Sequence, residues 1–148
     1  MPADSATVHA SAVLAGARAV LIRGPAGAGK SRLALALVHA AQSGLIPFAR
    51  LVGDDRVHLE AQHGRLLVRP AAALAGLIEV RGLGIRQLAY EPVAVVGLVV
   101  DLASADAGRL PAPADQEAVI SGIRLPRLAV ALEPLSCVLA LLRTTGAA

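Results

Sequence analysis

The segment from Gly24 to Ser31 reads GPAGAGKS and matches the phosphate-binding pattern G-x-x-x-x-G-K-[ST]. Glycines in such a loop let the backbone turn its N–H groups toward a polyphosphate, and the helix that follows presents its positive end to the same anion. Lys30 is the only lysine among 14 basic residues, and a lysine here reaches the β- and γ-phosphates while the serine hydroxyl binds Mg²⁺. ATP and Mg²⁺ are therefore the predicted cofactors, and the predicted nucleotide-binding residues are Gly24, Pro25, Ala26, Gly27, Ala28, Gly29, Lys30 and Ser31.

Transfer of a γ-phosphoryl group also requires carboxylates, one near Mg²⁺ and one that takes the proton of the acceptor. Asp54 and Asp55 follow the short apolar run Leu51–Val52. Because successive residues at a strand end point to opposite sides, one carboxylate can face the metal and the other an incoming hydroxyl. The alternative is that Gly53, Asp54 and Asp55 form an ordinary turn.

A second strand end offers a competing carboxylate. The run Val95–Val100 is apolar apart from Gly97 and leads directly into Asp101. Four apolar residues followed by Asp are typical of the metal-supporting strand in P-loop ATPases. On this pattern alone Asp101 is the better candidate, so the strand ends leave the choice between Asp101 and the Asp54–Asp55 pair open.

The elements around the glycine-rich loop have the required order. Thr7–Leu14 and Ala19–Ile22 are predicted strands of one hairpin, and a helix is predicted from Ser31 to about Gln42. Further predictions are strands at Leu51–Val52, Val57–Glu60, Arg65–Val68, Val93–Leu102, Val119–Ile123 and Leu128–Leu132, a short segment Leu77–Ile85, a surface loop Ser104–Asp115 and a helix Leu135–Arg143 behind Pro134. This order predicts one α/β domain over residues 1–148, with a mixed sheet flanked by helices and ATP at its carboxyl edge.

The composition excludes several other classes. No apolar run of the 148 residues reaches the ~18 needed to cross a membrane, and residues 1–5 lack the basic and apolar parts of a secretory signal. Cys137 is the only cysteine, which fits a reducing compartment, so we expect a cytoplasmic protein without membrane contact. The net charge is +3, but the arginines are scattered and only Phe48 and Tyr90 are aromatic, so nucleic acid is not an expected partner.

Four segments in fixed order resemble the catalytic domain of the HPr kinase/phosphorylase family. They read HASAV from His9, then GPAGAGKS, LVGDDRV and IEVRGLGI, and the last, around Glu79, is the most specific. The resemblance runs from about His9 to Asp101 and is closest to the short form found in some proteobacteria. It implies a P-loop fold like that of phosphoenolpyruvate carboxykinase. It also implies transfer of phosphate from Mg-ATP to a serine of the phosphocarrier protein HPr, in regulation of the sugar and nitrogen phosphotransferase systems.

The same resemblance implies roles for individual residues. One carboxylate of the Asp54–Asp55 pair would be the base that acts on the substrate serine, and which one is left open. Glu79 would bind Mg²⁺ together with Ser31, while His9 matches an active-site histidine of the family. The implied catalytic residues are His9, Lys30, Asp54, Asp55 and Arg81, and the implied metal ligands are Ser31 and Glu79.

Several features stay open at this point. The sequence LPRLAVALEPLS occupies the place of a family segment whose arginine serves phosphate release from phospho-HPr, so retention of phosphorylase activity is not predicted. A homo-oligomer is neither required nor excluded. Two other classes also fit the residues: a small-molecule kinase or ATPase that uses Asp101, and a non-catalytic module that senses ATP.

Overall fold

The computed structural model describes residues 6–107, 112–131 and 133–143. The chain opens with a hairpin of β1 (Val8–Ala15) and β2 (Arg18–Arg23), and a glycine-rich loop leads from β2 into α1 (Lys30–Gln42). The following elements are β3 (Ala49–Gly53), β4 (Arg56–Gln62), β5 (Arg65–Pro70), β6 (Leu77–Val80), β7 (Gly84–Gln87), β8 (Ala94–Leu102), β9 (Glu117–Ile120), β10 (Ile123–Val130) and α2 (Pro134–Arg143), with 3₁₀ turns at Ala72–Leu74 and Pro113–Gln116.

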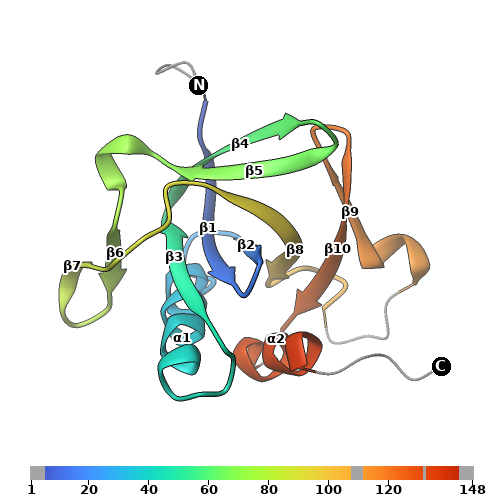
Figure 1. Cartoon of the computed structure of the whole chain (residues 1–148). Coiled ribbons are helices and arrows are strands. Elements are labelled where there is room, and N and C mark those ends of the chain that lie inside the picture. Colours follow the sequence, from blue (N-terminus) through green and yellow to red (C-terminus); the bar gives the residue numbers. More distant parts are fainter. Residues whose placement is uncertain (1–5, 108–111, 132, 144–148) are drawn as a thin grey trace.

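Eight strands form one mixed sheet that is strongly curved (Figure 1). Its pairings run β2-β1-β4-β5-β8-β10-β9, and β2 also pairs with β8, so five strands close into a ring. β2 lies parallel to β8, and β8 lies parallel to β10, while the remaining strand pairs are antiparallel. The predicted mixed α/β sheet is therefore confirmed.

β2 is buried on both faces, which explains its uninterrupted apolar sequence. Val20 and Ile22 pack in a cluster with α1 residues such as Leu33, whereas Ala19 and Leu21 pack in a second cluster inside the ring of strands. Successive side chains of a strand point to opposite faces, so a strand between two cores reads as a continuous apolar run. The strand that delivers the glycine-rich loop is thus held rigidly from both sides.

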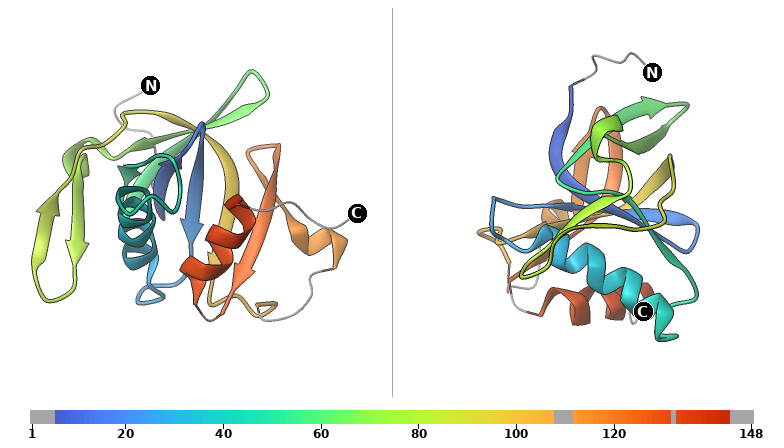
Figure 2. Two further views of the ribbon diagram at one scale, coloured as in Figure 1. Left: turned by 60° about the horizontal axis from the view of Figure 1, so that its bottom comes forward. Right: turned by 90° about the vertical axis from the view of Figure 1, so that its left-hand side faces the viewer.

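Both helices cover the same face of the sheet (Figure 2). Leu37 of α1 and Val138 of α2 belong to one cluster of buried side chains together with Val100 of β8. No helix in the described part of the chain is long and apolar enough to cross a membrane.

The C-terminal strands differ from the predicted ones. The expected strand Val119–Ile123 is interrupted by a turn at Ser121-Gly122, where both residues have positive φ, 51° and 78°. Such a two-residue turn matches the twist of the flanking strands and makes a β9–β10 hairpin. The expected strand Leu128–Leu132 instead starts at Ile123 and ends at Val130, and residue 132 lies outside the described residues.

Pro126 explains why the start of β10 escaped prediction, since proline removes a backbone donor and argues against a central strand. In the structure Pro126 pairs with Glu117 at the start of β9, and from Arg127 onward β10 pairs with β8 instead. The proline therefore lies where the strand changes partner. The predicted loop Ser104–Asp115 contains the start of the 3₁₀ turn, and residues 108–111 lie outside the described part.

The segment predicted as Leu77–Ile85 is a separate two-stranded sheet, the β6–β7 hairpin. The left view in Figure 2 shows it projecting from the body of the molecule beside α1. Ile78 anchors it, because this side chain is only 1 % exposed and belongs to the same cluster as Leu33 and Leu37 of α1.

Candidate functional site

The glycine-rich loop lies between β2 and the first turn of α1. Gly27 and Gly29 have φ values of 81° and 101°, a region that other residues rarely adopt. Lys30 is 8 % exposed, and its Nζ donates hydrogen bonds to the carbonyl oxygens of Gly24 and Pro25 at 2.8 and 3.1 Å. The ammonium group is therefore folded back against the loop, within reach of any anion that the loop holds.

Asp54 follows β3 and is almost completely buried, with 4 % of its surface exposed. Its Oδ1 accepts hydrogen bonds from Ser11 Oγ at 2.6 Å and from Ser31 Oγ at 2.7 Å, and its Oδ2 lies 2.8 Å from Ser31 Oγ. Pairing of β3 with β1 sets Gly53 opposite Ala12, which brings Ser11 to this carboxylate. Asp54 thus faces the first turn of α1 and the hydroxyl expected to bind Mg²⁺.

Asp55 points elsewhere. It has a φ of 67°, and its Oδ1 lies 2.9 Å from His9 Nε2, with 60 % of the carboxylate side chain exposed. β1 and β4 pair His9 with Arg56, which places the imidazole beside the carboxylate. The two neighbouring carboxylates therefore diverge, one buried against Ser31 and the other open to solvent beside a histidine.

One cavity of about 450 Å³ collects the four sequence segments. The residues lining it are His9, Ala26, Gly27, Gly29, Lys30, Ser31, Arg32, Leu35, Asp55, Glu79, Val80 and Arg81. Glu79 lies in β6 and Arg81 in the turn that follows it, so the projecting hairpin forms one wall. The volume lies in the range of ordinary ligand pockets. Of the predicted site residues, Gly24, Pro25, Ala28 and Asp54 are not among the lining residues.

Two polar residues of this site were not predicted. Ser11 is fully buried and fixes Asp54, and Arg32 lines the cavity. The only signal for Ser11 was a hydroxyl inside an otherwise apolar strand, since a buried hydroxyl needs a partner. Its partner is distant in sequence and could not be named.

Oxygen donors suited to Mg²⁺ meet at the first turn of α1. Magnesium is usually held by one or two carboxylates, with phosphate oxygens and water completing its shell. The Ser31 hydroxyl and the Asp54 carboxylate fit this requirement. Among the described residues no group of three or more His, Cys, Asp or Glu side chains is arranged to hold a metal.

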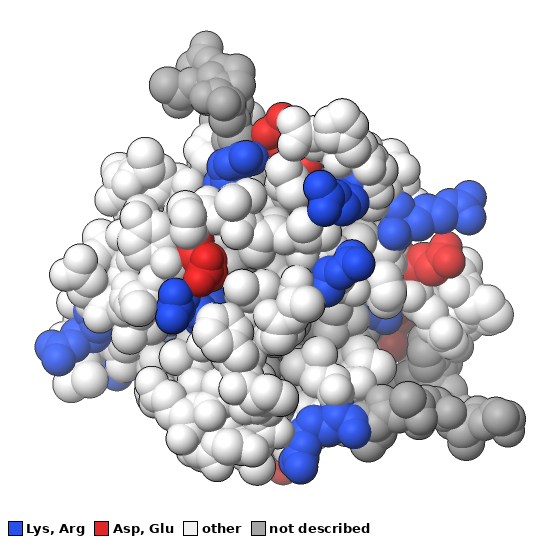
Figure 3. Space-filling view, viewed as in Figure 1, with Lys and Arg blue, Asp and Glu red and all other residues white. Residues whose placement is uncertain are grey.

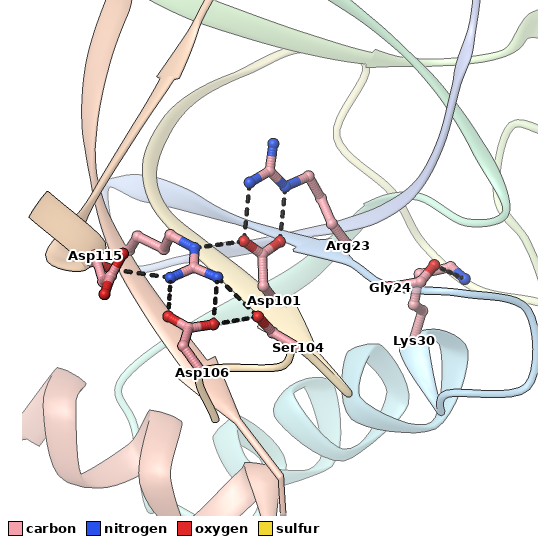
Figure 4. A network of polar contacts seen from close by, with 8 residues as sticks. Arg23, Gly24, Lys30, Asp101, Ser104, Asp106 and Asp115 are labelled. Carbon is pink, nitrogen blue, oxygen red and sulfur yellow. Dashed lines mark hydrogen bonds and ion pairs between the residues drawn. The ribbon is translucent and has the colours of Figure 1, made fainter. Parts of the chain in front are cut away.

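The competing carboxylate, Asp101, is occupied by two arginines at the carboxyl end of β8 (Figure 4). Arg23 Nε and Nη2 donate to its two oxygens at 2.7 and 2.9 Å, and Arg127 Nε donates at 2.6 Å. Arg127 also donates to Asp106 and Ser104, and to the backbone carbonyl of Asp115. Asp101 is not among the residues lining the cavity.

The pKa values in this network follow from its geometry. Burial alone would raise the pKa of Asp101, but the hydrogen bonds from Arg23 and Arg127 outweigh it and lower the pKa below the usual value. Hydrogen bonds from Arg127 and Ser104 likewise hold the pKa of Asp106 far below its usual value. The network therefore contains two ionised carboxylates at neutral pH and stabilises the structure.

Replacing Asp101 with asparagine should destabilise the fold by about 1.5–3 kcal/mol at pH 7, the usual size for hydrogen bonds to charged groups. A carboxylate whose pKa is lowered on folding stabilises the protein above its unfolded pKa of about 3.9 and loses this effect as the pH falls through the folded pKa. Urea unfolding at several pH values should show the difference between Asp101→Asn and wild type shrinking below about pH 4.

The matched control is Asp115→Asn, because Asp115 accepts from Arg127 through its backbone carbonyl, which this change retains. The control should unfold like wild type at each pH. Equal stability of Asp101→Asn and wild type at neutral pH would contradict the structural role.

Comparison with known proteins identifies the family. A family model described as the HPr Serine kinase C-terminal domain matches residues 2–135. The chain belongs to this family. The solved structure of the Hpr(Ser) kinase/phosphatase from Coxiella burnetii superposes with a TM-score of 0.75 at 25 % identity, covering 94 % of this chain and 95 % of that one.

Curated relatives are similar over a shorter stretch. The HPr kinase/phosphorylase of Streptococcus thermophilus is 42 % identical over 84 residues, which is 56 % of this chain and 25 % of that protein. The HPr kinase/phosphorylase of Exiguobacterium sp. is 36 % identical over 99 residues, 62 % of this chain and 30 % of that protein. The matched part thus spans about a quarter to a third of the length of these relatives. The family identified from the four motifs is confirmed.

Proposed function

We propose that this chain transfers the γ-phosphoryl group of Mg-ATP to a serine hydroxyl of an HPr-type phosphocarrier protein. The observation that carries the proposal is the convergence of the glycine-rich loop, the His9–Asp55 pair and the Glu79–Arg81 segment on one cavity. The family to which the chain belongs supports the kinase class. The P-loop form of the fold, similar to phosphoenolpyruvate carboxykinase, is part of the proposal.

The phosphate end of the nucleotide is assigned to the glycine-rich loop. Backbone N–H groups of the loop and the start of α1 face the anion, and Lys30 adds a positive charge that can move from the Gly24 carbonyl to a phosphate oxygen. Mg²⁺, when bound, neutralises charge on the phosphate oxygens. Ser31 and Asp54 would hold it on one side, and Glu79 would help from the β6 side of the cavity.

The acceptor end is assigned to Asp55. Its carboxylate takes the proton of the serine hydroxyl while the serine oxygen bonds to the γ-phosphorus and the bond from that phosphorus to the leaving ADP oxygen breaks. His9 holds one carboxylate oxygen at 2.9 Å and so orients the base. Arg81 lines the same cavity and adds positive charge near the transferred group. This division makes Asp54 the metal-side carboxylate and Asp55 the base.

The test incubates the purified chain with Mg-ATP labelled at the γ-phosphate and the HPr-type carrier encoded in the same genome. We expect label on one carrier serine, and none on a carrier in which that serine is alanine. Consumption of ATP without any carrier would instead favour a small-molecule kinase or ATPase. Binding of ATP without transfer would favour a nucleotide-sensing module, and either result would contradict the proposal.

A further inference from the structure

The β6–β7 hairpin exposes apolar side chains that the fold does not use. Leu83 is 69 % exposed and Ile85 is 63 % exposed, among the highest values for large apolar residues of the described chain. The opposite face of the hairpin packs against the body of the molecule. Ile78 is buried in the cluster that contains α1 residues, and Val80 packs against this cluster. One face therefore anchors the hairpin, and the other presents apolar surface to solvent.

Strand register places this apolar surface next to the cavity. Ile85 lies directly opposite Glu79 in the antiparallel pair, and side chains at opposed positions share a face with their Cβ atoms about 5 Å apart. Leu83 lies in the turn that joins the two strands. Because Glu79 lines the cavity, an occupant that contacts Ile85 also touches the mouth of the cavity.

Positive charge borders the same surface. Arg81 precedes Leu83 and Ile85 in the sequence RGLGI, and all three side chains are exposed. Arg86 lies opposite Ile78 in the strand pair and so belongs to the other face of the hairpin. Figure 3 shows basic side chains at the left edge of the molecule, over the β6–β7 hairpin. An apolar pair beside Arg81, which also lines the cavity, complements a partner segment that combines apolar residues with carboxylates.

We propose that Leu83 and Ile85 dock the protein substrate through an apolar segment that carries acidic residues and adjoins its acceptor serine. This inference rests on the proposed function. A small acceptor would be enclosed by the cavity and would gain nothing from side chains outside it. A serine on a folded protein enters only at the mouth, and the residues around it must rest on the surrounding surface, which here is the hairpin.

The test compares Leu83→Ser/Ile85→Ser with the control Val119→Ser, whose side chain is 64 % exposed on β9, away from the hairpin. Phosphorylation rates are measured against carrier concentration, and nucleotide affinity is measured with a fluorescent ATP analogue. We expect the double variant to raise KM for the carrier about 10- to 100-fold, with kcat and nucleotide affinity retained. The control should behave like wild type.

Two results would overturn the docking role. One is an unchanged KM in the double variant while wild type phosphorylates the carrier, which leaves the proposed function intact. The other is a wild-type dimer in light scattering that becomes a monomer in the double variant, which would show that a second copy covers the hairpin. If wild type transfers no phosphate, the proposed function fails. In that case, binding of the carrier to wild type and to the double variant is measured by fluorescence anisotropy. The docking role is overturned if wild type does not bind the carrier, or if the two proteins bind it equally well.

Discussion

Replacing Lys30 with alanine should lower the rate of phosphate transfer by at least about 10²–10³-fold, the usual cost of removing one group that stabilises transition-state charge. No other lysine exists in the chain to replace it. The Nζ atom is held by the Gly24 and Pro25 carbonyls, so it is positioned before nucleotide binds. Lys30→Arg should also be strongly impaired, because a planar guanidinium does not substitute for a compact ammonium on a flexible stem.

Thermal unfolding separates this effect from misfolding. A ligand that binds only the folded state stabilises it by an amount that grows with its concentration. Wild type and the exposed control Arg65→Ala should gain stability with Mg-ATP, whereas Lys30→Ala should fold normally and gain much less. Full stabilisation and full transfer by Lys30→Ala would contradict the assignment of the glycine-rich loop to phosphate.

Asp55→Asn should slow the transfer by about 10²–10⁴-fold, the range contributed by a positioned general base. The amide cannot take the serine proton, yet its size is unchanged, so carrier and nucleotide affinities should be nearly those of wild type. Single-turnover kinetics with bound Mg-ATP measure the step directly. His9→Gln serves as a comparison, because glutamine can still donate to Asp55, and we expect a much smaller loss there.

Asp54→Asn should fail in a different way. The buried carboxylate accepts from Ser11 and Ser31 and faces the metal side, so its replacement should weaken the Mg²⁺-dependent part of nucleotide binding. If Asp55→Asn weakens Mg²⁺-dependent nucleotide binding while Asp54→Asn keeps tight binding, the two roles are reversed. The exchange would still leave the pair as the chemical centre.

The local part of the site could be predicted from the sequence. A strand, a glycine-rich loop and a helix follow one another within 25 residues, from the start of β2 to the end of α1, and their conformations depend on neighbouring residues. The divergence of Asp54 and Asp55 was also predicted, but its cause differs: the two residues form the bend between β3 and β4, where Asp55 has a φ of 67°, and not a continuation of the strand. The structure confirms the β1–β2 hairpin and α1, and it shows the side chains of Asp54 and Asp55 pointing to different sides.

Long-range contacts could not be predicted. One partner of Asp101 is Arg127, 26 residues away, and the parallel pairing of β8 with β10 brings the two together. The same is true of Ser11 and Asp54, separated by 43 residues. A carboxylate at a strand end has the same sequence pattern whether it meets a metal or two arginines, so the pattern favoured Asp101 when read by itself.

The hairpin of β6 and β7 illustrates a third limit. Its sequence alternates too briefly to distinguish a strand of the main sheet from a separate element, and glycines at 82 and 84 interrupt it. In the described part its two strands pair only with each other, apart from the main sheet. Which strands join the main sheet is a property of the whole fold.

The most direct test measures transfer from γ-labelled Mg-ATP to the carrier serine by Asp54→Asn, Asp55→Asn and Asp101→Asn under one set of conditions, at a temperature where all three remain folded. We predict that both variants of the Asp54–Asp55 pair lose transfer while Asp101→Asn retains it at close to the wild-type rate. Loss of transfer in Asp101→Asn, with the two other variants active, would contradict the account and move the chemistry to the end of β8.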